Sequence, residues 1–259
     1  MRIAAFQMQA STGDSAANLA RIASAAAEAA AGGAALLIVP ELAVAGYGAG
    51  EAFPALASPP AGSIGKALAE IARRNGITIV AGFAEDDGGV IYNSAILTDG
   101  ATEPAVYRKS NLYGDYERKW FTPETPSTVL ATVGGVRLGV LICYDVEFSE
   151  NVRRLAMAGA DLVVVPTALP KGSSDRFIAD KMIPVRAFEN QIFVAYVNHC
   201  GTDNKFTYAG LSRISAPDGA FLAEGPAEGE VLLFADIDPT AYATSRVENA
   251  YLADFVRGP

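Results

Sequence analysis

The sequence predicts an α/β fold with two packed sheets, and two observations lead to this prediction. Apolar, strand-like runs alternate with helix-like patterns along the 259 residues. Residues 33–40 (GAALLIVP) are echoed by residues 159–166 (GADLVVVP) about half the chain later, as expected if two related halves each contribute a sheet. The alternative is that helix–Gly–strand–Pro is simply a common α/β unit. Several strands follow one another with no helix between them, which argues against a Rossmann repeat or an eightfold barrel.

The first half of the chain is expected to open with a strand at 2–8 and an Ala-rich helix. Asp14 and Ser15 offer side chains that cap the start of this helix, and a left-handed glycine at Gly32–Gly33 ends it. A helix at 63–74 is expected to stop at Asn75–Gly76. Strands are predicted at 35–39, 77–83, 90–97 and 105–109.

The second half repeats the pattern with buried strands and two helices. The helix at 151–158 is short, and the helical segment at 175–191 is bent by Pro184. A hairpin turn is expected at Asp218–Gly219, and the tail from residue 240 has a mixed pattern. No linker rich in Pro, Gly or Ser divides the chain, so we expect a single domain over 1–259. Strands are predicted at 136–142, 161–165 (ended by Pro166), 192–198, 208–216, 220–223 and 230–236.

Composition and charge limit the possible binding partners of the protein and its possible cellular location. Apolar residues make up 51% and charged residues 19%, which excludes intrinsic disorder. The net charge is −9 and no run of Lys and Arg is longer than two, so nucleic acid is not an expected partner. No apolar stretch has the roughly 18 residues of a membrane span, and the first residues are too short an apolar run for a signal peptide. We therefore expect no membrane partner and a cytoplasmic location.

The cysteine and histidine counts limit the possible chemistry. Two cysteines do not form a disulfide framework in a chain of this size. The single histidine, His199, excludes a His-rich metal site, and a Cys–His or Ser–His relay is possible only through it. Otherwise His199 is structural, and Cys200 beside it is expected to pack in the core.

Three residues that can carry chemistry each lie at the end of a predicted strand or just beyond it. Cys143 comes after the strand at 136–142, and a helix opens shortly afterwards, so its thiol would lie in positive potential. Glu41 follows an apolar strand and a proline, and a carboxylate between apolar walls can act as a general base near neutral pH. Lys109 ends the strand at 105–109, where its ammonium can stabilise an oxyanion. Each has an ordinary alternative: a core cysteine, a solvated acid and a surface lysine.

Together these residues occupy the carboxyl ends of separate strands, where α/β sheets place their sites. The stretches around them resemble the three signatures of the nitrilase superfamily of carbon–nitrogen hydrolases: residues 37–41 (LIVPE), 107–113 (YRKSNLY) and 138–145 (LGVLICYD). The resemblance extends from residue 2 to about residue 251, and the joint occurrence in this order is highly specific. It implies a four-layer α-β-β-α sandwich, in agreement with the echo between the two halves.

The resemblance also implies a role for each residue. Cys143 would be the nucleophile, Glu41 the general base and acid, and Lys109, with the main-chain N–H of Tyr144, the oxyanion stabiliser. Many amidases of the family carry a second glutamate eight residues after the lysine, which corresponds here to Glu117. Glu117 would orient Lys109 and the substrate amide. The reaction would pass through a thioester on Cys143 and would need no metal or organic cofactor.

The sequence after the nucleophile indicates a branch of the family. Tyr144 and Asp145 follow the cysteine, where nitrilases proper often have Trp–Glu, and this favours an amidase. Residues 143–156, 186–191 and 193–201 look most like 5-aminopentanamidase (δ-aminovaleramidase) and related stereoselective amidases. The expected substrate is a small aliphatic primary amide, with an ω-amino amide such as 5-aminopentanamide as one option.

Substrate-binding residues are expected near the catalytic positions. Tyr47, Tyr113 and Tyr144 would line the cleft. A distal ammonium on the substrate would need an acidic partner, for which Glu147 and Asp203 are the candidates. Alternatively, Glu147 only favours the positive end of the following helix, and Asp203 only belongs to a polar loop.

Other functions stay open at this point. The same scaffold could hydrolyse an N-carbamoyl amine or a nitrile, and His199 could serve a Cys–His hydrolase. A protein of another class, a non-catalytic interaction partner, could also retain the fold. By resemblance alone, we expect a homodimer or a larger even homo-oligomer that assembles through helices, with a small-molecule amide as the substrate.

Overall fold

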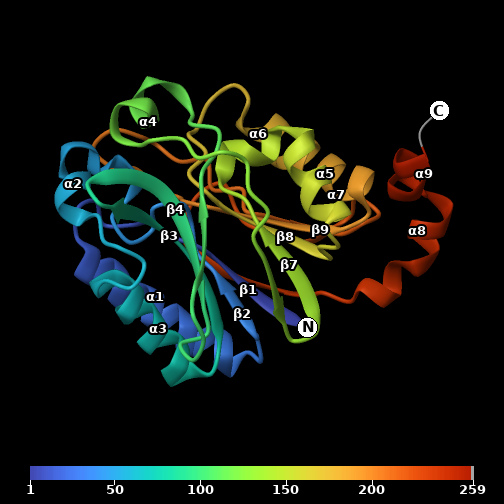
Figure 1. Cartoon of the computed structure of the whole chain (residues 1–259), viewed down its shortest axis with the longest axis horizontal. Coiled ribbons are helices and arrows are strands. Elements are labelled where there is room, and N and C mark those ends of the chain that lie inside the picture. The colour runs from blue at the N-terminus through green and yellow to red at the C-terminus, as the bar shows by residue number, and fades with distance from the viewer. Residues whose placement is uncertain (258–259) are drawn as a thin grey trace.

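Two six-stranded sheets pack face to face between helical layers in the computed structural model, which describes residues 1–257 (Figure 1). The strand orders are β12-β1-β2-β3-β4-β5 and β11-β10-β9-β8-β7-β6. The prediction of a four-layer α-β-β-α sandwich is therefore confirmed. The last two residues of the domain expected over 1–259 lie outside the described residues.

The first sheet is built mainly from the first half of the chain. Asp14 caps α1 (Ser15–Ala31) by accepting a hydrogen bond from the main-chain N–H of Ala17, and Gly76, in the left-handed conformation, ends α3 (Ser63–Asn75). Both helices cover the outer face of the sheet (Figure 1). The sheet contains β1 (Arg2–Gln7), β2 (Leu36–Ile38), β3 (Thr78–Asp87), β4 (Val90–Thr98), β5 (Ala105–Arg108) and β12 (Val231–Asp236).

The second sheet is covered by α5 (Ser149–Met157) and α7 (Ile183–Asn190) (Figure 1). The segment expected as one bent helix consists of α6 (Asp175–Phe177), the π-helical turn η3 (Ile178–Met182) and α7, and Pro184 lies in the first turn of α7. The sheet contains β6 (Leu130–Val133), β7 (Val136–Val140), β8 (Leu162–Thr167), β9 (Phe193–Asn198), β10 (Arg213–Ser215) and β11 (Phe221–Glu224).

The wholly apolar character of the central strands follows from this layering. Leu36 and Ile38 of β2 pack into the core between the two sheets, whereas Leu37 packs into the core beneath α1 and α3. A strand that is buried on both faces cannot alternate apolar and polar residues. Strands β2 and β8, which carry the two echoed sequences, both occupy the interior of their sheets.

Three strand predictions were wrong in extent. The strand expected over 77–83 continues to Asp87, because β3 pairs with β4 all the way to their connecting turn. Pro166 does not end β8, which continues to Thr167 alongside β9. On its other side, β8 pairs with β7 only as far as Val164, so the missing N–H of Pro166 interrupts no hydrogen bonds to β7. The strand expected over 208–216 is reduced to β10, because Gly210 and Leu211 have positive φ angles of 62° and 54° and break the extended backbone.

Other elements were not predicted from the sequence. The loop after β5 contains α4 (Gly114–Trp120), β6 pairs with the edge of β7, and the mixed tail forms α8 (Ala243–Glu248) and α9 (Tyr251–Arg257). Short turns complete the chain: η1 (Tyr47–Ala52), α2 (Phe53–Leu56), η2 (Cys143–Glu147) and η4 (Pro239–Tyr242).

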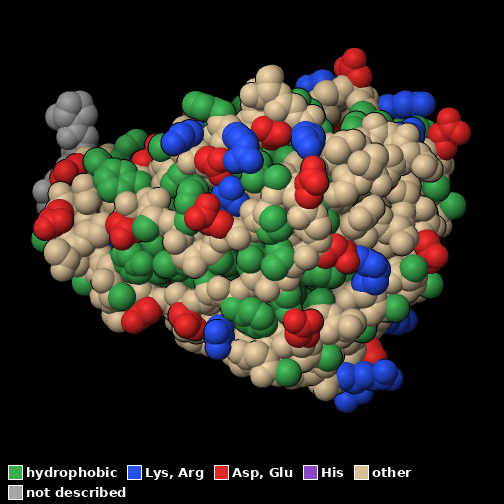
Figure 2. All heavy atoms as spheres, turned by 180° about the vertical axis from the view of Figure 1, so that it is seen from behind, with side chains coloured by type: hydrophobic (Ala, Val, Ile, Leu, Met, Phe, Trp, Pro, Cys, Tyr) green, Lys and Arg blue, Asp and Glu red, His purple; other side chains and the backbone are tan. Residues whose placement is uncertain are grey.

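The surface mixes charges of both signs. On the face shown in Figure 2, Lys and Arg side chains lie among Asp and Glu side chains and form no continuous basic area. Among residues 1–257, no helix is both long enough and apolar enough to cross a membrane.

Candidate active site

Glu41 lies immediately beyond β2 and Pro40, and its side chain is fully buried. Its Oε1 accepts hydrogen bonds from Lys109 Nζ at 2.6 Å and from Asn93 Nδ2 at 2.7 Å. Its Oε2 is buried and has no hydrogen-bond partner among the described residues. One oxygen therefore anchors the carboxylate, and the other is left to exchange a proton.

The main chain around Glu41 runs against Gly82 of β3. Gly82 donates its N–H to the carbonyl of Pro40 at 3.2 Å and accepts from the N–H of Val44 at 3.3 Å. A Cβ at position 82 would lie 2.6 Å from the Pro40 carbonyl oxygen and 2.7 Å from the Glu41 carbonyl carbon. Only glycine allows this close approach, which the sequence did not reveal.

Lys109 lies just beyond β5, fully buried between two carboxylates. Its Nζ donates to Glu41 Oε1 and, at 2.7 Å, to Glu117 Oε1. Burial lowers the pKa of Lys109, but the charges of Glu117 and Glu41 outweigh burial and hold this pKa well above its usual value. The ammonium is therefore a permanent positive charge inside the protein.

Glu117 is presented by α4 and completes the anchoring of this ammonium. It accepts from the Tyr47 hydroxyl at 2.8 Å through Oε1 and from the Tyr113 N–H at 2.8 Å through Oε2. Burial raises the pKa of Glu117, and the charge of Lys109 opposes that rise. The structure thus brings Glu117 to Lys109, and the Tyr47 hydroxyl holds the Glu117 carboxylate in place.

Cys143 begins the 3₁₀ turn η2 after β7, and its φ of 45° is in the left-handed region that residues with a Cβ rarely adopt. Burial raises the pKa of its thiol well above the ordinary value, and the charge of Glu41 raises it further while Lys109 lowers it. At neutral pH the resting group is therefore a thiol. Nucleophilic attack needs a base that takes the proton.

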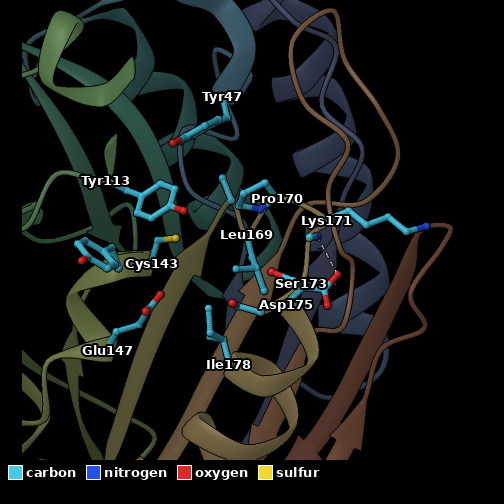
Figure 3. A pocket seen from close by; sticks show the side chains of 14 residues that line it. Tyr47, Tyr113, Cys143, Glu147, Leu169, Pro170, Lys171, Ser173, Asp175 and Ile178 are labelled. Atoms are coloured by element: carbon cyan, nitrogen blue, oxygen red, sulfur yellow. Dashed lines mark hydrogen bonds between the residues drawn. The ribbon is translucent and has the colours of Figure 1, made fainter. Parts of the chain in front are cut away.

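Cys143 opens into a cavity of about 480 Å³ (Figure 3). Four of the five residues considered for substrate binding line this cavity: Tyr47, Tyr113, Tyr144 and Glu147. The opposite wall comes from residues 168–175 and Ile178, a stretch that the sequence did not single out. Its Pro170, Gly172 and two serines directly after a buried strand were the available signal.

Glu147 brings a carboxylate to the cavity wall near Cys143 (Figure 3). Burial raises its pKa, and the charges of Lys109 and Arg186 lower it. Asp175 lies on the opposite wall. Asp203, the other acidic candidate, does not line this cavity, because it accepts hydrogen bonds from Tyr208 Oη and from the main-chain N–H groups of its own loop.

His199 does not contact Cys143. Its Nε2 lies 2.7 Å from the carbonyl oxygen of Glu41 and its Nδ1 lies 3.1 Å from that of Met8, while burial lowers its pKa. Both ring nitrogens face main-chain oxygens, so the alternative of a Cys–His relay is wrong and the ring supports the Glu41 segment instead. Cys200 beside it is buried, as expected.

Asn93 of β4 is a further site residue that sequence reasoning missed. Its amide donates to Glu41, and its main-chain oxygen accepts from the Lys109 N–H at 2.8 Å. An amide side chain within an apolar strand was the available signal. Within residues 1–257, His, Cys, Asp and Glu side chains form no group of three that could hold a metal ion.

The sequence model of the carbon–nitrogen hydrolase family matches residues 2–246. The chain belongs to this family. A hydrolase of Pseudomonas protegens is 41% identical to this carbon–nitrogen hydrolase, over 98% of the chain and 88% of its own length. An (R)-stereoselective amidase of Pseudomonas sp. is 35% identical, over 98% of the chain and 91% of its own length.

A solved structure extends the likeness to the whole fold. A double mutant of the amidase from Nesterenkonia sp. AN1, in complex with acrylamide, matches with a TM-score of 0.88 and 35% identity, over 98% of this chain and 93% of that one. Another structure of that amidase shows covalent addition of the acetamide moiety of fluoroacetamide at its active-site cysteine. That amidase is described as a member of the nitrilase superfamily, so the resemblance found in the sequence is confirmed.

Proposed function

We propose that this carbon–nitrogen hydrolase is a cysteine amidase, which converts a small aliphatic primary amide and water into a carboxylic acid and ammonia. One observation carries the proposal: a buried ammonium, Lys109, lies between Glu41 and Glu117, and the charges of all three act on Cys143, which lines the cavity. The amidases of Pseudomonas and Nesterenkonia among its relatives support the same reaction.

The first half-reaction begins with transfer of the Cys143 thiol proton to the free oxygen of Glu41. The sulfur attacks the amide carbon, and Lys109 and the Tyr144 N–H stabilise the oxyanion that forms. Removal of one such donor typically costs about 2.7–4 kcal/mol in the activation barrier. Glu41 then gives its proton to the departing nitrogen, the C–N bond breaks, and ammonia leaves a thioester on Cys143.

The second half-reaction uses the same groups. Glu41 takes a proton from a water molecule, the hydroxide oxygen attacks the thioester carbon, and the C–S bond breaks. The proton returns to the sulfur, and the carboxylic acid leaves. Glu117 contributes by holding Lys109 and orienting the substrate amide, and its hydrogen bond to Tyr47 supports this role.

We propose further that the substrate carries an ammonium at its far end, as 5-aminopentanamide does. The half-buried carboxylate of Glu147 supports this proposal, because it stands in the cavity wall near Cys143, and Asp175 adds a second negative charge across the cavity. A charge-assisted hydrogen bond contributes about 1.5–3 kcal/mol. Glu147→Gln should therefore raise KM for 5-aminopentanamide about 10- to 100-fold and leave KM for pentanamide, the matched neutral amide, unchanged.

The deciding experiment measures ammonia release by the wild type and by Cys143→Ala. The panel holds 5-aminopentanamide, glutarate monoamide, a branched α-amino amide, an N-carbamoyl amine and a nitrile. Turnover of an amide that Cys143→Ala loses is expected. If the enzyme turned over only the carbamoyl compound or only the nitrile, the amidase proposal would be wrong and that reaction would be its activity. If no compound of the panel is turned over and no thiol reagent labels Cys143, the protein would instead be a non-catalytic interaction partner.

We also propose that the chain acts as one catalytic domain in a homodimer or a larger even assembly. Apolar side chains exposed on helices over the second sheet support the assembly: Met157 on α5, Val185 on α7, and Tyr251 and Phe255 on α9. Gel filtration that gives a monomer at micromolar concentration would contradict it. A cytoplasmic location is proposed as well, because both cysteines are free and a thiol nucleophile stays reduced there.

A further inference from the structure

Asp145 has no part in the reaction described above, yet its carboxylate is fully buried two residues after Cys143. A buried carboxylate is costly unless hydrogen bonds compensate the loss of water. Its contacts therefore indicate what it contributes.

The hydrogen bonds to this carboxylate come from the segment that carries Lys109. The Tyr107 hydroxyl donates to Oδ2 at 2.9 Å, the Asn111 N–H donates to Oδ1 at 2.8 Å, and the Ser110 N–H approaches Oδ2 at 3.4 Å. These donors lie on both sides of Lys109 in the chain. The carboxylate thus ties the turn of the nucleophile to the backbone that carries the ammonium.

This tie crosses from one sheet to the other. Lys109 follows β5 of the first sheet, whereas Cys143 and Asp145 follow β7 of the second. Asn151 of α5 adds a second link, because its Nδ2 donates to the Asp145 carbonyl at 2.9 Å and to Asn111 Oδ1 at 3.2 Å. A left-handed residue such as Cys143 persists only where its surroundings fix it.

We propose that ionised Asp145 is a positioning residue that fixes Lys109 relative to Cys143 across the two sheets. The inference rests on the proposed cysteine amidase function for its kinetic consequences. Protonation would replace an acceptor oxygen by a donor that faces the main-chain N–H groups and Tyr107. The segment of Lys109 would then lose its fixed distance from the sulfur.

The proposal predicts an acid limb in the pH dependence of kcat. Burial raises the pKa of Asp145 to about 6, and the charge of Lys109 and the hydrogen bonds from Asn111, Tyr107 and Ser110 oppose that rise. Lys109 and Tyr107 are the ionisable groups among these neighbours, whereas Asn111 and Ser110 act through main-chain N–H groups. The charge of Arg154 acts on Tyr107 and opposes the rise of its pKa on burial. Loss of the Tyr107 hydroxyl removes one opposing hydrogen bond and should move the acid limb to higher pH.

The test compares Tyr107→Phe and Asp145→Asn with the wild type, and with Tyr92→Phe as a matched control on the neighbouring strand β4. For Asp145→Asn we expect kcat on the best amide of the panel to fall about 10²-fold, with KM nearly unchanged, since a displacement of 1 Å costs this much. For Tyr107→Phe we expect kcat at pH 8 to fall less than in Asp145→Asn, because the two main-chain donors remain, and we expect the acid limb to shift upward. Tyr92→Phe should leave that limb where the wild type has it.

A second readout separates this inference from the amidase function. The rate of Cys143 alkylation by iodoacetamide, with the site identified by peptide mapping against Cys200, depends on the nearby Lys109 charge and on no amide turnover. Asp145→Asn should slow the alkylation even if every compound of the panel is inert. Unchanged alkylation together with an unmoved acid limb in Tyr107→Phe would overturn the proposal. If Asp145→Asn does not fold, Tyr107→Phe alone decides by the position of the limb.

Discussion

Replacement of Gly82 by alanine should impair catalysis although Gly82 touches no substrate. The new Cβ would lie 2.6 Å from the Pro40 carbonyl oxygen and 2.7 Å from the Glu41 carbonyl carbon, and closer still to the Leu42 nitrogen. Ordinary non-bonded contacts are about 3.5–4 Å, so the segment must move by about 1 Å. These neighbours are main-chain atoms rather than flexible side-chain ends, and the movement therefore displaces Glu41 itself.

The expected cost has two parts that can be measured separately. Overpacking should lower the free energy of unfolding by about 1–3 kcal/mol. A displacement of the general base by about 1 Å should lower kcat about 10²-fold. Denaturant unfolding gives the first quantity, and initial rates per folded molecule, well below the melting temperature, give the second.

Gly139→Ala provides the matched control for this prediction. In β7 the three atoms nearest to the added Cβ would all belong to the Leu155 side chain, the nearest at 2.9 Å, and that side chain can change its rotamer. The control should lose stability and keep its kcat. A folded Gly82→Ala variant with kcat within twofold of the wild type would refute the reasoning.

Three further predictions follow from the site. Glu41→Gln should lower kcat about 10²–10⁴-fold through loss of the base. His199 only supports the main chain of Glu41, so His199→Gln should lower kcat much less. If initial rates showed the larger loss for His199→Gln, a histidine relay would be supported instead. The raised pKa of Asp145 means that the native state holds this proton more tightly, so wild-type stability should fall as pH rises from about 4 to 6. Asp145→Asn lacks this titration, and its stability relative to the wild type should rise by about 2 kcal/mol between pH 4 and pH 7 in denaturant unfolding. Glu147→Arg should reverse the substrate preference, so that kcat/KM becomes higher for glutarate monoamide than for 5-aminopentanamide. An unchanged ratio of the two kcat/KM values would show that Glu147 does not recognise the far end of the substrate.

Much of the site could be predicted because each key residue is marked by its own strand. Glu41, Lys109 and Cys143 each follow a strand that the local pattern reveals, and the strands end at the same side of the sandwich. Glu117 could be found only through the resemblance, because no periodicity marks the short helix α4.

The missed features depend on contacts between distant segments. Gly82 and Asn93 matter because the registers of β2 with β3 and of β3 with β4 bring them to Glu41, and no local pattern specifies those registers. Asp203 was a candidate because it is acidic, yet its loop folds back on itself and satisfies the carboxylate locally.

Because the site is divided between two sheets, the chain can be divided into two fragments that each carry only part of the catalytic residues. Residues 122–129, which belong to no helix or strand, separate a fragment with Glu41, Lys109 and Glu117 from a fragment with Cys143. Neither fragment alone holds both a nucleophile and its base. Turnover of an amide would therefore appear only when the fragments reassemble, and the enzyme could be converted into a split reporter of association between two fused partners.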